Sequence, residues 1–315
     1  MREHQRNAHD MDTRRPIDTQ AFMLTTLLCL IWGFQQVAMK FAAADITPLM
    51  QIGIRSGAAA LLVALAMRMQ GEAVFVRDGS LKAGVAAGFL FAIEFVLIGE
   101  GLRYTSASHL VVFLYTAPIF AALGLHVTLP SERLAPLQWA GIALAFAGIG
   151  VAFLLRGGSA AASGSNMLLG DALALGAGIA WGATTVVIRN SVLARASAKR
   201  TLLYQLVGAS LLALAVAFAS GQWGWRFTPT SLTSMAFQIF VVAFFSYLAW
   251  FWLMRHYLAS RLGVFTFMTP LFGVAFGITL LNETLEPSFI AGTVLVLAGV
   301  VMVSGYDWVR RPAPA

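Results

Sequence analysis

Long apolar runs, separated by short polar segments, make up most of the chain. We expect ten helices, at about residues 20–43, 47–69, 80–101, 105–127, 135–155, 167–189, 199–219, 232–254, 262–281 and 286–306. Each run is about twenty residues long, the length at which an α-helix crosses the hydrocarbon core of a bilayer. Apolar and polar positions do not alternate along the runs, which excludes a transmembrane β-barrel. The pattern predicts an all-α integral membrane protein with ten transmembrane helices.

The second half of the chain repeats the landmarks of the first half. Four of them recur in the same order, 149 to 152 residues later: Trp32-Gly33 and Trp181-Gly182, Pro118 and Pro270, Glu132 and Glu283, Gly141 and Gly292. Each half holds five predicted spans, so the second half enters the membrane from the opposite side. We predict two inverted five-helix repeats (5+5), residues 20–156 and 157–306, between cytoplasmic tails at 1–19 and 307–315. Inverted repeats are typical of secondary transporters, whose substrate site lies near the bilayer midplane.

Composition and charge agree with a membrane protein. The chain is 59% hydrophobic and 11% charged, whereas soluble domains carry about 25% charged residues. The net charge of +7 does not indicate a nucleic-acid partner, because the basic residues are spread over short loops. Few of them fall on the side of the membrane opposite the two chain ends: Lys40, Arg103, Arg156 and Arg226. The positive-inside rule therefore places both termini in the cytoplasm.

The repeated motifs resemble a known family. The two Trp-Gly pairs, the run Thr105-Ser106-Ala107-Ser108 with Pro118, and the segments Glu132-Arg133-Leu134 and Glu283-Thr284-Leu285 are similar to the drug/metabolite transporter superfamily, of the type built from two EamA repeats. More narrowly, the chain resembles the YddG-type exporters of aromatic and other neutral amino acids. The resemblance implies a bacterial inner-membrane exporter with a cavity lined by its first, third, fourth, sixth, eighth and ninth helices. The fifth and tenth helices would lie outside, a position that leaves a homodimer open.

Glu94 is the most informative single residue, because a carboxylate at membrane depth is costly and is a functional candidate by default. It lies inside the span at 80–101, among apolar neighbours. Three roles remain open for it: binding a substrate ammonium group, carrying a proton, and forming a structural hydrogen bond to another helix.

Aromatic and amide side chains supply the other candidate cavity residues. They are Trp32, Gln35, Tyr115, Trp181, Tyr247, Trp250 and Phe265. A Trp inside a span needs a partner for its indole N–H, and helix packing or contact with lipid is the alternative role for each ring. Uncharged donors suit a neutral or zwitterionic solute better than a phosphate. An aromatic amino acid is therefore a reasonable substrate.

Pro118, Pro270 and His109 are candidates for gating. A mid-helix proline frees a backbone carbonyl and bends its helix, so the two prolines predict matching hinges. His109 lies near Glu100 and Arg103 at the outer face. It is either a pH-sensitive outer gate or a satisfied histidine beside a local ion pair.

Five further charged positions have a structural interpretation. Glu132 and Glu283 each precede the next predicted helix, where a carboxylate favours the helix N-terminus. Lys40 and Arg189 are related by the repeat and lie near helix ends, where side chains can extend to the interface. For Arg55, inside the second span, an interhelical pair with a carboxylate such as Asp45 is one open role.

Several function classes are excluded. The sequence has no His-Glu-x-x-His motif, no mid-span carboxylate pair and no Walker-type loop, so we expect neither an enzyme, a metal, a cofactor nor ATP-driven transport by this chain alone. We predict a secondary transporter that exports small neutral metabolites, aromatic or hydrophobic amino acids above all, by alternating access. An uncoupled facilitator, and an exporter of hydrophobic cations that uses Glu94 as counter-charge, remain as alternatives.

Overall fold

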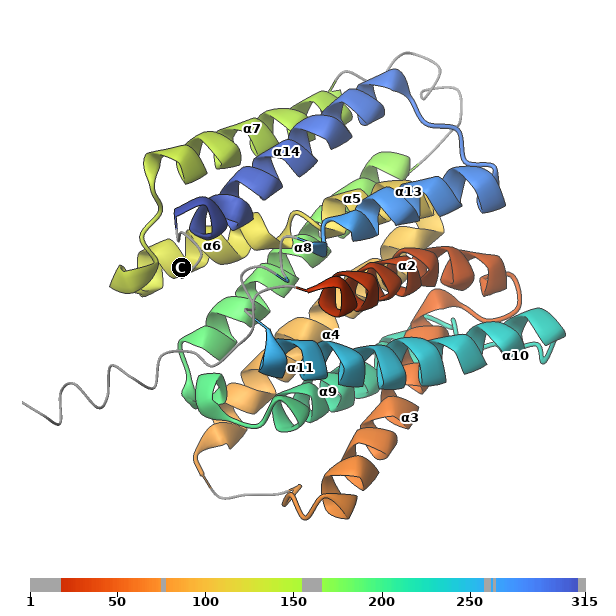
Figure 1. Ribbon diagram of the computed structural model, residues 1–315. Helices are drawn as coiled ribbons and strands as arrows, with labels where there is room; N and C mark the ends of the chain where they lie inside the picture. The colour runs from red at the N-terminus through yellow and green to blue at the C-terminus, as the bar shows by residue number, and fades with distance from the viewer. Residues whose placement is uncertain (1–17, 75–77, 155–165, 258–261, 263–264, 311–315) are drawn as a thin grey trace, which may run out of the picture.

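The computed structural model of the protein describes residues 18–74, 78–154, 166–257, 262 and 265–310 (Figure 1). Its main elements, in chain order, are α2 (Thr19–Ala42), α3 (Pro48–Met69), α4 (Ser80–Tyr104), α5 (Ala107–Leu114), α6 (Ala117–Thr128), α7 (Pro136–Leu154), α8 (Met167–Arg189), α9 (Ala198–Ala219), α10 (Pro229–Ala236), η3 (Phe237–Ser246), α11 (Tyr247–His256), α13 (Met268–Leu281) and α14 (Pro287–Arg310). Over these ranges, nine helical stretches are long and apolar enough to span a bilayer, and α13 is a shorter apolar helix. The predicted all-α multi-span class is confirmed.

Polar side chains at the ends of the apolar runs fix where the helices begin. Asp18 accepts a hydrogen bond from the backbone N–H of Ala21 at 2.8 Å and starts α2. Thr228 and Ser231 form a capping box at the start of α10, with Pro229 in the first turn. A helix terminus leaves backbone N–H groups without partners, and these side chains satisfy them.

The predicted fourth span is broken rather than bent at its proline. α5 ends at Leu114 and α6 begins at Ala117, one residue before Pro118. Proline cannot donate the backbone hydrogen bond that would continue the helix. At this break the carbonyl oxygen of Phe113 accepts hydrogen bonds from the hydroxyl of Thr116 at 2.6 Å and from the backbone N–H of Thr116 at 3.2 Å. The eighth span also departs from a regular helix, because η3 is a π-helix between α10 and α11.

Small residues allow the helices to approach closely. α7 and α14 run side by side at one edge of the bundle (Figure 1). A Cβ atom added to Gly148 would lie 2.7 Å from the carbonyl oxygen of Gly292, and one added to Gly141 would lie 2.8 Å from that of Gly299. These distances leave no room for a side chain, which is how small residues serve helix packing in lipid.

The two Trp-Gly motifs make equivalent contacts. A Cβ on Gly33 would lie 2.8 Å from the backbone nitrogen of Gly273 in α13, and a Cβ on Gly182 would lie 2.8 Å from that of Ala121 in α6. Each glycine therefore contacts the helix that carries the other half's proline.

The exact division into five and five helices stays a prediction.

Candidate functional site

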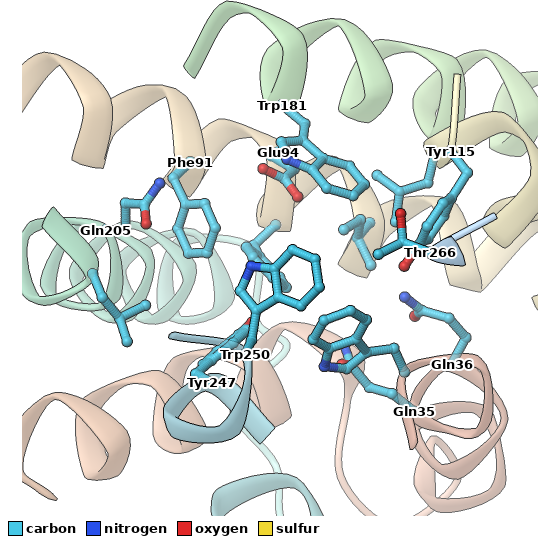
Figure 2. A pocket seen from close by; sticks show the side chains of 15 residues that line it. Gln35, Gln36, Phe91, Glu94, Tyr115, Trp181, Gln205, Tyr247, Trp250 and Thr266 are labelled. Carbon is cyan, nitrogen blue, oxygen red and sulfur yellow. The ribbon is translucent and has the colours of Figure 1, made fainter. Parts of the chain in front are cut away.

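A cavity of about 300 Å³ lies among six helices and the segment before α13 (Figure 2). Its lining residues are Trp32, Gln35 and Gln36 of α2, Phe91, Glu94, Phe95 and Ile98 of α4, Leu114 of α5 with the adjoining Tyr115, Trp181 of α8, Leu202 and Gln205 of α9, Tyr247 and Trp250 of α11, and Thr266. The volume is at the lower end of the range for small-molecule sites, which are mostly apolar with a few polar groups.

Two buried acceptor atoms in this cavity lack partners. Glu94 and Gln36 are each 4% exposed. No donor in the described part of the chain reaches Glu94 Oε2 or Gln36 Oε1. A buried polar atom without a hydrogen bond is costly and requires an explanation. Because both atoms accept hydrogen bonds, they fit a ligand that carries N–H donors.

Aromatic side chains form much of the wall, and their mutual contacts fix them. Trp32 packs edge-on against Trp250 with ring centroids 5.5 Å apart, and Tyr115 packs edge-on against Trp181 at 5.3 Å. The indole Nε1 of Trp32 donates to Ser246 Oγ at 2.9 Å. Edge-to-face pairs of this kind add to the stability that burial supplies. The cavity wall is therefore held in place before any ligand binds.

The structure brings together seven of the eight predicted cavity residues: Trp32, Gln35, Glu94, Tyr115, Trp181, Tyr247 and Trp250. The eighth, Phe265, lies outside this lining and packs against Phe22 with centroids 5.5 Å apart. Its neighbour Thr266 reaches the cavity instead. We did not predict Thr266 or Gln205, and α9 was not among the expected lining helices. Gln205 is a single amide within the apolar run at 199–219, and its position there was the signal that could have identified it.

Arg55 does not form the pair with Asp45 that the sequence left open. Asp45 forms an ion pair with the exposed Arg226 at 2.9 Å and accepts a hydrogen bond from Thr228. Arg55 is 2% exposed, and its guanidinium carbon lies 4.7 Å from the centroid of the Phe95 ring. It is thus a buried cation beside the cavity.

Glu283 lies at a helix N-terminus, but not at the following helix as predicted. It accepts hydrogen bonds from the backbone N–H groups of Ala107 and Ser108 at 2.7 and 3.0 Å, and from Ser108 Oγ at 2.5 Å. It therefore caps α5, in the other half of the chain. Lys40, expected to extend to the interface, donates to the carbonyl oxygens of Leu102 and Thr105, both at 2.6 Å. These contacts tie α2, α4 and α5 to the α13–α14 loop.

His109 belongs to a buried polar cluster. Its Nδ1 lies 3.0 Å from Asp171 Oδ2, its ring stacks on Phe289 with centroids 3.6 Å apart, and Thr105 donates to Asp171. Glu100 and Arg103 form a separate ion pair at 2.6 Å. We did not predict Asp171 as the histidine's partner. The cluster joins α5 to α8 and α14, away from the residues that line the cavity.

Arg189 and Glu132, which the repeat relates to Lys40 and Glu283, lie at the opposite end of the bundle. Arg189 and Glu132 form an ion pair there, with 53% and 35% of their side chains exposed. Two more ion pairs join α9 to residues between α3 and α4. Lys199 pairs with Glu72 at 2.5 Å, and Arg200 pairs with Asp78 at 2.6 Å. Within the ranges given above, no three His, Cys, Asp or Glu side chains cluster as metal ligands would.

Two segments of the chain, residues 19–154 and 168–305, match the sequence profile of the EamA-like transporter family. The chain belongs to the EamA-like transporter family. It is a membrane transporter, and the resemblance found in its repeated motifs is confirmed. The family is one of transporters rather than enzymes.

Curated relatives of this EamA-like transporter cover nearly the whole chain. It is 23% identical over 278 residues to "Uncharacterized transporter YoaV" of Bacillus subtilis, covering 87% of this chain and 92% of the relative. It is 26% identical over 305 residues to the "Probable amino-acid metabolite efflux pump" of Salmonella typhimurium, covering 92% and 96%. A solved crystal structure matches with a TM-score of 0.63 at 18% identity, over 93% of this chain and 99% of the other, which supports the fold alone.

Proposed function

We propose that this EamA-like transporter exports small amino-bearing metabolites, aromatic or hydrophobic amino acids above all, from the bacterial cytoplasm. Substrate would bind in the cavity between the two halves of the chain and leave by alternating access. The observation that carries the proposal is Glu94, an unpartnered buried acceptor in a cavity walled by aromatic rings. The printed name of the Salmonella relative, an amino-acid metabolite efflux pump, agrees with this substrate class.

Each group in the cavity has a defined role in this proposal. The substrate ammonium group donates to Glu94 Oε2 and Gln36 Oε1, and an aromatic or aliphatic side chain packs among Trp32, Trp181 and Trp250. Pro118 and Pro270 serve as hinges, and His109 belongs to the outer gate. Both termini lie in the cytoplasm, as the distribution of Lys and Arg indicates.

Transport into proteoliposomes tests the proposal. Labelled phenylalanine is compared with a hydrophobic quaternary ammonium dye, and we expect the amino acid to be transported. A Glu94→Gln variant keeps the shape of the side chain and removes its charge, so we expect transport to fall about tenfold or more, given the value of a hydrogen bond to a charged group. Movement of the dye without the amino acid would contradict the proposed substrate.

Export of hydrophobic cations is the second candidate, because a carboxylate and tryptophan faces both attract cations. An uncoupled facilitator is the third, and it differs only in its response to ion gradients. Collapsing the proton gradient across the vesicle membrane should leave facilitated transport unchanged and abolish concentrative export. In intact cells, a proton-coupled exporter should also raise resistance to toxic aromatic amino-acid analogues.

A further inference from the structure

Arg55 is a buried guanidinium group with few partners. It lies on α3 and is 2% exposed. Its only hydrogen bond within the described chain runs from Nη1 to Gln238 Oε1 at a long 3.5 Å. A guanidinium has five N–H donors and cannot be deprotonated in a protein. A permanent positive charge is therefore held at membrane depth with most of its hydrogen-bonding capacity unused.

A polar network fixes the one partner that Arg55 has. Gln238 Nε2 donates to Gln51 Oε1 at 2.6 Å and to Ser234 Oγ at 3.1 Å, which turns its carbonyl oxygen toward Arg55. Gln51 Nε2 in turn donates to the carbonyl oxygens of Met39 and Ile46 at 3.0 and 2.9 Å. The network orients the arginine, but its neutral amides do not balance the positive charge.

The charge lies directly behind the cavity wall. The guanidinium stacks on the ring of Phe95, which lines the cavity next to Glu94. Glu94, the residue before Phe95 on α4, and Tyr247 of α11 line the same cavity. Arg55 and Glu94 do not form an ion pair, and the ion pairs found among the described residues join other side chains. A carboxyl group therefore lines the cavity and a guanidinium group lies behind its wall, and the two do not neutralise each other by contact.

This arrangement complements a zwitterion. An ammonium group at Glu94 and a carboxylate within the field of Arg55 would each face an opposite charge, and charge–charge energies are large where water is excluded. With a bound amine that lacks a carboxylate, the site carries a net charge of +1, because Glu94 can balance only one of the two positive groups, and an unbalanced buried charge is costly. A bound zwitterion leaves the site with no net charge, whereas a bound amine leaves it positive. The site therefore favours amino acids over amines.

We propose that Arg55 makes the cavity select zwitterionic amino acids over amines that lack a carboxylate, acting as a positioning residue through the wall at Phe95. The inference rests on the proposed function, because it concerns the substrate of the same cavity. It adds a residue outside the lining to the determinants of specificity.

Transport of matched substrates tests the inference. Proteoliposomes with the full-length chain are given labelled phenylalanine, with unlabelled phenethylamine as competitor. We expect phenethylamine to compete at least about tenfold more weakly than unlabelled phenylalanine. In Arg55→Gln we expect the half-saturating phenylalanine concentration to rise about tenfold, with the maximal rate little changed, and the preference over phenethylamine to be lost. Arg55→Lys keeps the charge and should restore most of the preference.

Controls separate specificity from folding. Arg226→Gln removes an arginine whose side chain is 71% exposed, outside the cavity, and should leave both substrates unaffected. Equal losses for phenylalanine and phenethylamine in Arg55→Gln would assign Arg55 a structural role and overturn the inference. If the variants do not fold, the competition in the wild-type protein decides, because equal competition by phenethylamine also overturns it. Wild-type protein that transports phenylalanine but is inhibited equally well by phenethylamine refutes the selectivity alone, whereas protein that does not transport phenylalanine contradicts the proposed function as well.

Discussion

The two ends of the bundle use equivalent residues in different ways. Lys40 and Arg189 are related by the repeat, as are Glu283 and Glu132. Glu283 makes three hydrogen bonds to the N-terminus of α5, and Lys40 donates to two backbone carbonyls nearby. Arg189 and Glu132 form one half-exposed ion pair. The same sequence pattern therefore gives a strongly bonded end and a weakly bonded end.

The difference agrees with the alternating-access mechanism proposed above. In alternating access, two similar halves exchange roles, so equivalent residues should differ in any single conformation. The cluster of His109, Asp171 and Phe289 adds to the contacts at the Lys40 end. The segment of the second half that corresponds to the start of α5 includes residues 258–261, outside the described part of the chain.

Removing the cap on α5 should give the largest effect. Glu283→Ala deletes three hydrogen bonds, two of them to backbone N–H groups at a helix start, and leaves those donors without a partner. We expect a loss of about 2–4 kcal/mol in the free energy of unfolding, measured by thermal denaturation in detergent, with a fall in transport rate. Glu132→Ala is the matched control and should cost less than about 1 kcal/mol. Equal losses would remove the difference between the ends.

Substitutions at Gly33 and Gly182 test whether the two halves of the chain pack equally tightly at their Trp-Gly motifs. Each added Cβ would meet backbone at 2.8 Å, so Gly33→Leu and Gly182→Leu should both destabilise the protein, by about 1–3 kcal/mol from overpacking. Gly150→Leu is the control, because no atom lies within 4 Å of its Cβ position. The measurement is the melting temperature of each purified variant. A large effect at only one of the two glycines would mean that the halves differ in packing as well as at their ends.

These features differ in how far the sequence could predict them. Apolar run length predicts the spans, because the bilayer imposes it. The high cost of polar groups in lipid singled out Glu94. The partners of Arg55, His109 and Glu283 were missed, because each partner lies on an element at least 62 residues away in the chain. Such contacts depend on how the helices pack, and hydropathy does not encode that.

A double-mutant cycle tests whether His109 and Asp171 act together. We expect His109→Gln and Asp171→Asn each to destabilise the protein, and the double variant to cost less than the sum, with a coupling energy of about 1 kcal/mol. As part of an outer gate, His109→Gln should also lower the transport rate. Additive effects on stability would mean that the observed contact contributes little.

The smallest expected effect is at the weakly bonded end. Arg189→Gln breaks an ion pair whose side chains are 53% and 35% exposed, and exposed pairs contribute about 0–1 kcal/mol. Lys40→Gln is the matched variant, and we expect it to cost about 1–3 kcal/mol, because carbonyl oxygens at the α4–α5 junction lose a charged donor. Added salt should reduce the Arg189 effect and leave the Lys40 effect largely unchanged, since screening acts mainly on exposed charges. If Arg189→Gln costs as much as Lys40→Gln, and salt acts equally on both, the two ends are equivalent in solution and the transporter does not favour the state seen here.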